Sequence, residues 1–114
     1  MISFYDEPRL ARNALSRFRR TDAGLAQLKG LTALQKLNLR NCPEVGDAGL
    51  GQLKGLTALQ DLDLQWTQVG DDSLATLKGF TALRRLDLRF TFVSPEGLAK
   101  LRKALPGCRI AATN

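Results

Sequence analysis

The 114-residue sequence predicts a single α/β domain built as a solenoid, in which similar units of chain stack side by side. Three near-identical segments carry this prediction, and they span residues 24–34, 49–59 and 73–83. Intervals of 25 and then 24 residues separate their matched leucines, Leu34, Leu59 and Leu83. A period of this size is typical of arrays in which each unit buries its apolar face only against a neighbour. Such an array presents a binding surface rather than a catalytic pocket.

Each unit also carries the leucine ladder L-x-x-L-x-L. The three ladders are Leu34, Leu37, Leu39; Leu59, Leu62, Leu64; and Leu83, Leu86, Leu88. Three residues after each ladder stands a cysteine or a threonine, at Cys42, Thr67 and Thr91. Over residues 21–110 this pattern resembles the leucine-rich repeat family, and it is similar to the cysteine-containing, F-box-type subclass and to short bacterial repeats. The resemblance implies a right-handed horseshoe with parallel strands on the concave face, short helices on the convex face and a binding role.

The ladders predict the strands directly. Successive side chains of a strand point to opposite faces, so Leu37 and Leu39 share one face of the first strand. Lys36, Asn38 and Arg40 then face the other way. The second and third units repeat this alternation.

Short helices follow the strands. They are expected to open at the matched positions Thr21, Gly46, Gly70 and Ser94, and the clearest start is Ser94 with a proline and a glutamate behind it. Each of the first three is expected to end at a glycine that follows a lysine and takes the left-handed conformation, namely Gly30, Gly55 and Gly79. Helices of roughly eight residues are marginal alone, so stacking must hold them.

The two ends depart from the repeat, which divides the chain into an N-terminal cap at 1–20, three repeats at 21–93 and a C-terminal cap at 94–114. For residues 1–20 we favour a capping helix that starts near Asp6, with a decayed repeat as the alternative. The last helix should continue to about Leu105, and residues 108–112 should form a short strand because Ile110 falls 24 residues after Leu86.

Charge and composition restrict the function. The net charge of +6 is concentrated in the caps, because residues 1–20 and 94–114 each carry +3 and residues 21–93 are balanced. No continuous basic groove is implied, so nucleic-acid binding through the caps is the least favoured function. The chain has no histidine, no metal-spaced cluster and no phosphate loop, so we expect no enzymatic activity, no cofactor and no metal site.

Cysteine use and hydropathy bear on location. Cys42 and Cys108 belong to strands too far apart for a disulfide, and Cys42 is expected to be a small buried side chain that donates a weak hydrogen bond. Reduced thiols, with no apolar run for a membrane span or export, favour the cytoplasm.

Three columns of side chains are expected on the concave face: Lys36, Asp61, Arg85; Asn38, Asp63, Asp87; and Arg40, Gln65, Arg89. In the first column Asp61 lies between two cations, which reads as a structural ladder. In the second, Asp63 and Asp87 are like-charge neighbours, which disfavours pairing unless something satisfies them. Either Arg85 and Arg89 do so, or a cationic side chain of a partner docks there.

An aromatic group adjoins these columns, with Trp66 and Phe90 at matched positions and Phe92 two residues further on. The first repeat has Asn41 at the matched position, so the repeat itself does not require a ring there. The rings either cover the turns by packing on each other or anchor a partner.

These observations predict a protein–protein interaction module with binding residues Asn38, Arg40, Asp63, Gln65, Trp66, Arg85, Asp87, Arg89, Phe90 and Phe92. The alternative is a structural fragment, a stacking or capping segment of a longer solenoid with no partner of its own. The edge of the strand at residues 36–40 distinguishes them. If residues 1–20 leave this edge uncovered, missing repeats or self-association through the N-terminal edge are expected.

Overall fold

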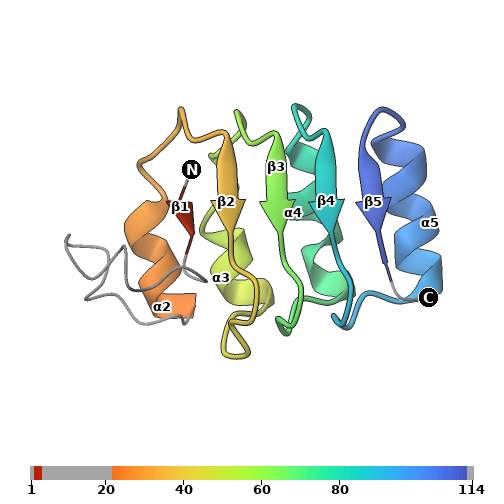
Figure 1. Ribbon diagram of the computed structural model, residues 1–114, viewed down its shortest axis with the longest axis horizontal. Helices are drawn as coiled ribbons and strands as arrows, with labels where there is room; N and C mark the ends of the chain where they lie inside the picture. The colour runs from red at the N-terminus through yellow and green to blue at the C-terminus, as the bar shows by residue number, and fades with distance from the viewer. Residues whose placement is uncertain (1, 4–21, 113–114) are drawn as a thin grey trace.

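The computed structural model of the chain describes residues 2–3 and 22–112. The strands in these residues are β1 (Ile2–Ser3), β2 (Lys36–Asn38), β3 (Asp61–Asp63), β4 (Arg85–Asp87) and β5 (Arg109–Ala111). They form one parallel sheet whose spatial order follows the chain order (Figure 1). The helices are α2 (Asp22–Leu25), α3 (Asp47–Gly51), α4 (Leu74–Gly79) and α5 (Pro95–Ala104), with 3-10 turns η2 (Ala26–Leu28) and η3 (Asp71–Ser73).

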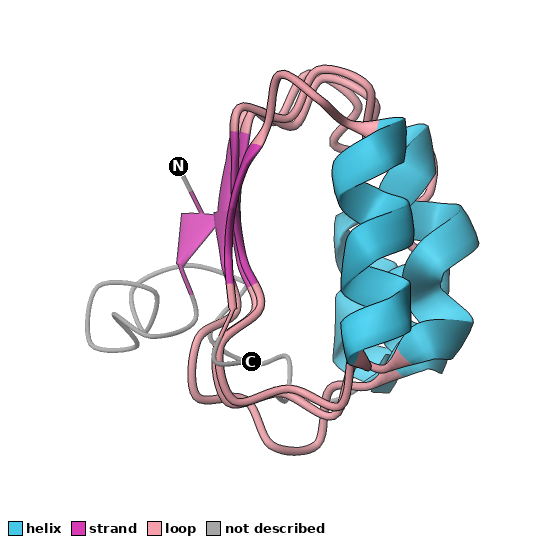
Figure 2. Ribbon diagram, turned by 90° about the vertical axis from the view of Figure 1, so that its right-hand side faces the viewer, coloured by secondary structure: helices cyan, strands magenta, loops and turns pink. Residues whose placement is uncertain are grey.

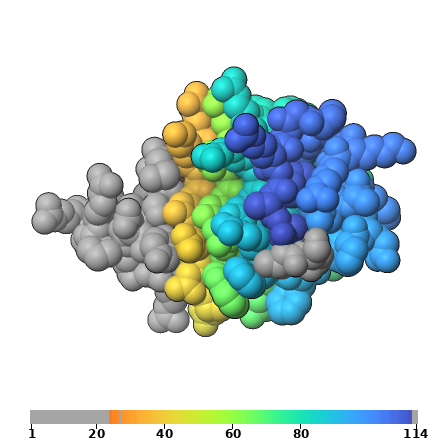
Figure 3. Space-filling view, turned by 45° about the vertical axis from the view of Figure 1, so that its right-hand side comes forward, coloured from red at the N-terminus to blue at the C-terminus, as the bar shows by residue number. Residues whose placement is uncertain are grey.

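The arrangement is an α/β solenoid. Figure 2 shows the helices together on one side of the sheet, while the other face carries no helix of the described residues. The space-filling view shows the repeats as adjacent bands, each against the next (Figure 3). Because every repeat has nearly the same length, each strand meets its neighbour in the same register.

That register confirms the pairing expected from the leucine spacing. Leu37 is the Cα partner of Leu62, Leu62 of Leu86, and Leu86 of Ile110. The last of these pairs belongs to β5, the short strand expected within residues 108–112. Intervals of 24 and 25 residues therefore each correspond to one turn of the solenoid.

The core lies between the sheet and the helices. Each central strand contributes two ladder leucines that are at most 2% exposed, for example Leu62 and Leu64 of the middle repeat. The helical side contributes a matched column of fully buried leucines, namely Leu28, Leu53, Leu77 and Leu101. Burial weakens at the C-terminal end, where Ile110 is only half-buried against the core.

The prediction that glycines end the helices in the left-handed conformation is wrong. No described glycine has a positive φ angle. The backbone instead closes with tight bonds three residues apart, as from the N–H of Leu56 to the carbonyl of Leu53 at 2.9 Å and from Phe80 to Leu77 at 3.2 Å. Such 3-10 closure satisfies the last carbonyls without a left-handed residue. A Cβ at Gly55 would meet nothing within 4 Å.

Aspartates at the helix starts hold successive repeats together. Asp47 accepts hydrogen bonds from the backbone N–H of Gly70 and the hydroxyl of Ser73, both in the next repeat. Asp71 accepts from the N–H and the hydroxyl of Ser94 in the same way. These bonds, the Ser94 hydroxyl first, lower the pKa of Asp71 below its ordinary value.

The last helix begins as expected. The Ser94 hydroxyl accepts from the N–H of Gly97 at 3.0 Å, and Pro95 occupies the first turn. The helix ends at Ala104, one residue short of the expected end at Leu105. Without a stop glycine it extends to ten residues, against five and six in α3 and α4.

At the opposite end, β1 lies against β2, with Ile2 and Ser3 as the Cα partners of Leu37 and Asn38. The edge of β2 is therefore paired at Leu37 and Asn38. The helix expected from Asp6, and its decayed-repeat alternative, lie outside the described residues.

Candidate functional site

The candidate site is the open face of the sheet, by which we mean the side chains that β2 to β5 direct away from the helices (Figure 2). The register places them in rows. The first row is Lys36, Asp61, Arg85 and Arg109, and the second is Asn38, Asp63, Asp87 and Ala111. At the ends of the strands follow Arg40, Gln65 and Arg89.

The second-row residues Asn38, Asp63 and Asp87 are the last residues of β2, β3 and β4, and their side chains form the turns that follow. The side-chain oxygen of Asn38 accepts from the backbone N–H of Arg40 at 2.9 Å. Asp63 and Asp87 accept equivalent bonds from the N–H two residues further on, at 3.0 and 3.1 Å. Asn and Asp favour this turn because their side chains replace a backbone acceptor. Asp63 and Asp87 therefore each have a structural role in their own repeat, independent of any partner that they bind.

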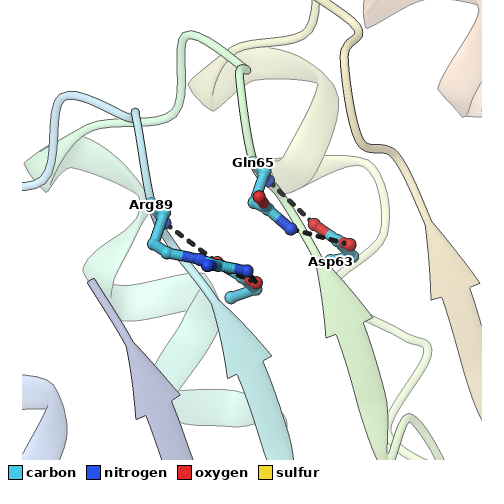
Figure 4. A network of polar contacts seen from close by, with 4 residues as sticks. Asp63, Gln65 and Arg89 are labelled. Carbon is cyan, nitrogen blue, oxygen red and sulfur yellow. Dashed lines mark hydrogen bonds and ion pairs between the residues drawn. The ribbon is translucent and has the colours of Figure 1, made fainter. Parts of the chain in front are cut away.

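The two carboxylates are balanced differently (Figure 4). The Arg89 guanidinium binds Asp87 with a closest distance of 2.8 Å, and this hydrogen bond raises the pKa of Arg89. Asp63 is instead bound by the neutral amide of Gln65, whose Nε2 lies 3.3 Å from the carboxylate. Gln65 is only 4% exposed, so it has little surface to offer a partner.

A groove of about 560 Å³ crosses the open face from β3 to β5. Six charged side chains line it, and they are Asp61, Asp63, Arg85, Asp87, Arg89 and Arg109. Arg89–Asp87 is the one ion pair formed between residues that the structure describes. The register places Asp61 between Lys36 and Arg85 as the column predicted, but Asp61 forms no ion pair with either of these two described residues.

The backbone turns sharply where each strand ends. Asn41, Trp66 and Phe90 occupy matched positions and have φ angles of 61°, 59° and 61°. Their N–H groups continue the ladder between repeats, from Asn41 to the carbonyl of Gln65 and from Trp66 to that of Arg89. Left-handed backbone is costly for side chains other than glycine, and Asn tolerates it best among the three.

The rings at these turns lie in solvent. Trp66 and Phe90 stack with centroids 4.1 Å apart and an interplanar angle of 10°. They nevertheless remain 52% and 45% exposed. Phe92 is 73% exposed and forms an isolated bridge with Gly70 in the preceding repeat. The described part of the molecule thus presents three exposed rings along two adjacent turns.

The structure gathers only part of the sequence-predicted set. The groove collects Asp63, Gln65, Arg85, Asp87 and Arg89. Asn38 lies in a separate depression between β2 and β3 with Lys36. Four residues lie outside the groove lining, at the strand ends and turns, and they are Arg40, Trp66, Phe90 and Phe92.

Comparison with protein families agrees with this geometry. Two consecutive segments, residues 30–53 and 55–78, match the family model described as Leucine Rich repeat. Each matched segment spans one turn of the solenoid, and the same strand spacing continues to β5. The chain contains leucine-rich repeats. No curated protein matches the sequence.

Leucine-rich repeats generally serve as protein-interaction modules and are typically not enzymes. This leucine-rich repeat chain has no helix, in its described residues, that is long and apolar enough to span a membrane. Neither Cys42, which is buried, nor Cys108, which is half-buried, forms a disulfide. Cys42 donates a weak bond to the carbonyl of Arg40 at 3.7 Å. Burial raises the pKa of the Cys108 thiol.

The leucine-rich repeat register adds groove residues that the sequence-based selection omitted. Asp61 was assigned a purely structural role, and Arg109 was never placed in a column. The spacing of Ile110 from Leu86 contained the missing signal, because it also puts Arg109 beside Arg85. Extending each column to the last strand would have identified it.

Proposed function

We propose that this chain is a protein–protein interaction module whose partner contacts the open face and the stacked rings of Trp66 and Phe90. In the horseshoe geometry that the family resemblance implies, this face is the concave one. The rings belong to repeats two and three, and the groove extends from the strands of these repeats to β5. Together they are a candidate for one continuous contact.

One observation carries the proposal: exposed aromatic rings occupy a left-handed turn position where the first repeat has Asn41. A left-handed L-residue costs roughly 1–2 kcal/mol, and Asn tolerates the conformation better. Stacking of one aromatic pair contributes about 0.5–1.5 kcal/mol beyond the surface that the rings bury. Two left-handed rings share this single stack, so the stacking contribution by itself is smaller than their combined conformational cost. About half of each ring remains exposed and can contact a partner.

The test replaces both rings with the residue that the repeat itself uses, in a Trp66→Asn/Phe90→Asn variant. The free energy of unfolding should change by less than about 1 kcal/mol, because relief of backbone strain compensates for the lost stack. Affinity for the partner captured from the native source should fall by about thirtyfold or more, as at an interface hot spot.

Leu31→Asn is the matched control, because Leu31 is 40% exposed but lies after η2, away from the turns. This control should retain every captured protein. If the double variant instead keeps its partners and loses about 2 kcal/mol or more of stability, the rings are structural and the binding surface lies elsewhere.

A second candidate is a segment of a longer leucine-rich repeat solenoid with no partner of its own. The half-buried Ile110 favours it, since matched leucines in inner strands are at most 2% exposed and a further repeat would cover this side chain. Intact-mass measurement of the native protein tests it, because a longer chain with further repeats is the expected result. A native mass of 12.5 kDa would exclude it.

A further inference from the structure

The groove on the open face is electrically polarised across its strands. Strand β3 contributes the carboxylates Asp61 and Asp63, whereas β4 and β5 contribute Arg85 and Arg109 from the first row. The remaining two charges, Asp87 and Arg89, neutralise each other in an ion pair at 2.8 Å. The groove therefore has an anionic side over β3 and a cationic side over β4 and β5.

The cationic side lacks internal compensation. Arg85 and Arg109 are direct Cα partners on adjacent parallel strands, which lie about 4.8 Å apart. Both side chains are exposed, and neither forms an ion pair with a described residue. Like charges directly opposite each other disfavour the pairing of their strands. Of the two arginines, only Arg85 has Asp61 as a neighbour in this row. Arg109 has Ala111 as its neighbour in the second row of the same strand.

Two arginines on adjacent strands suit a carboxylate ligand. Arginine binds carboxylates through two parallel N–H bonds and is more weakly hydrated than lysine, so it loses less on contact. The floor beside the pair is apolar and small, formed by Ala111 and the half-buried Ile110. An extended peptide therefore has room to approach the arginines.

We propose that Arg85 and Arg109 bind an acidic side chain, Asp or Glu, in an extended segment of the partner protein. This rests on the proposed function, because it assumes that the partner crosses the open face. A nucleic acid fits the groove less well, since its regular phosphates would also pass Asp61 and Asp63. An acidic peptide can place its charge on one side of the groove alone.

The experiment uses the full chain and hexaglutamate as the probe, with hexathymidylate as the nucleic-acid comparison. Binding is followed by amide chemical shifts and by fluorescence of Trp66, the only tryptophan. We expect saturable binding of hexaglutamate with shifts centred on β4 and β5, weakening between about 20 and 200 mM salt as surface charges are screened.

The Arg85→Ala/Arg109→Ala variant should bind the probe about tenfold or more weakly, as expected for the loss of charge-assisted hydrogen bonds. Arg102→Ala/Lys103→Ala is the control, because it removes the same charge from the exposed last turn of α5. It should change the affinity by less than about twofold if long-range attraction is minor. Melting curves establish that both variants fold, and Arg85→Lys/Arg109→Lys, which keeps the charge, should give an intermediate loss.

Three results would overturn the inference: no binding at low salt, equal losses in the arginine and control variants, or tighter binding of hexathymidylate than of hexaglutamate. The aromatic variant of the preceding section is tested by partner capture and not by this probe. If hexaglutamate does not bind at Arg85 and Arg109 but a partner is captured through the rings, only the proposed acidic ligand is refuted. If hexaglutamate binds at the two arginines but partner capture does not depend on Trp66 and Phe90, the proposed role of the rings is refuted.

Discussion

At the scale of single residues, the backbone of the repeat requires certain conformations and hydrogen bonds, and different side chains meet these requirements in different repeats. The turn after each strand requires a left-handed residue, which Asn41 supplies and Trp66 and Phe90 also adopt. The strand end requires a side-chain acceptor, which Asn38 supplies in the first repeat and Asp63 in the second. Asn alone would meet both needs, so the rings and carboxylates in later repeats add surface properties that the fold does not demand.

A glycine in the turn that follows α3 gives a sharp residue-scale prediction. Gly55 has a negative φ and open space where a Cβ would stand, so Gly55→Ala should stabilise the protein by about 0.4–1 kcal/mol through the lower entropy of the unfolded chain. Urea unfolding of the variant measures this. Destabilisation by more than about 1 kcal/mol would show that the left-handed conformation predicted from the sequence exists in solution.

At the scale of elements, short helices are held from outside. Helix α3 has five residues, and no side chain of its own caps it at Gly46. Its stability comes from burial of Leu50 and from the bonds of Asp47 to the repeat that follows. Isolated helices of this length are unstable in water, so each element exists only because the next repeat completes it.

The Asp71–Ser94 contact makes this dependence sensitive to pH. The folded pKa of Asp71 is lowered from 3.8, so its contribution is present above pH 3.8 and is lost as the pH falls through the lower folded value. The melting temperature of Asp71→Asn should lie below wild type at neutral pH, and the difference should shrink below about pH 4. Thermal unfolding across this range checks it.

Asp72→Asn is the control for net charge, because Asp72 is the exposed neighbour of Asp71 in η3. Its melting temperature should follow wild type more closely at every pH. A difference between Asp71→Asn and wild type that stays constant down to pH 2 would mean that the Ser94 contact does not depend on ionisation, contrary to the linkage argument.

At the scale of the whole molecule, stability belongs to the stack rather than to any one repeat. Leu62 is buried in the middle repeat, between Leu37 on one side and Leu86 on the other. Inner layers are thus closed from both directions, while the half-buried Ile110 marks a layer closed from one. Short arrays depend strongly on such inner contacts, because only adjacent repeats interact.

Removing one inner leucine should therefore affect the entire domain. Leu62→Ala is expected to lower the free energy of unfolding by about 2–5 kcal/mol, through lost burial and the cavity left behind. Leu31→Ala, at an exposed leucine, should cost less than about 0.5 kcal/mol. Urea unfolding of both variants provides the comparison. A cost below about 1 kcal/mol for Leu62→Ala would contradict the assignment of Leu62 to the buried leucine ladder.

The sequence by itself determined the repeat, the strand register and the buried ladder, because spacing along the chain becomes position in the stack when every turn has the same length. The pairing of Leu86 with Ile110 and the isolation of Cys42 from Cys108 follow from that arithmetic. Only the tertiary structure decided the backbone at Gly55 and Trp66, the burial of Gln65 and the ion pair of Asp87 with Arg89. These depend on competition between neighbouring groups for the same space and the same charge, which periodicity along one chain does not record.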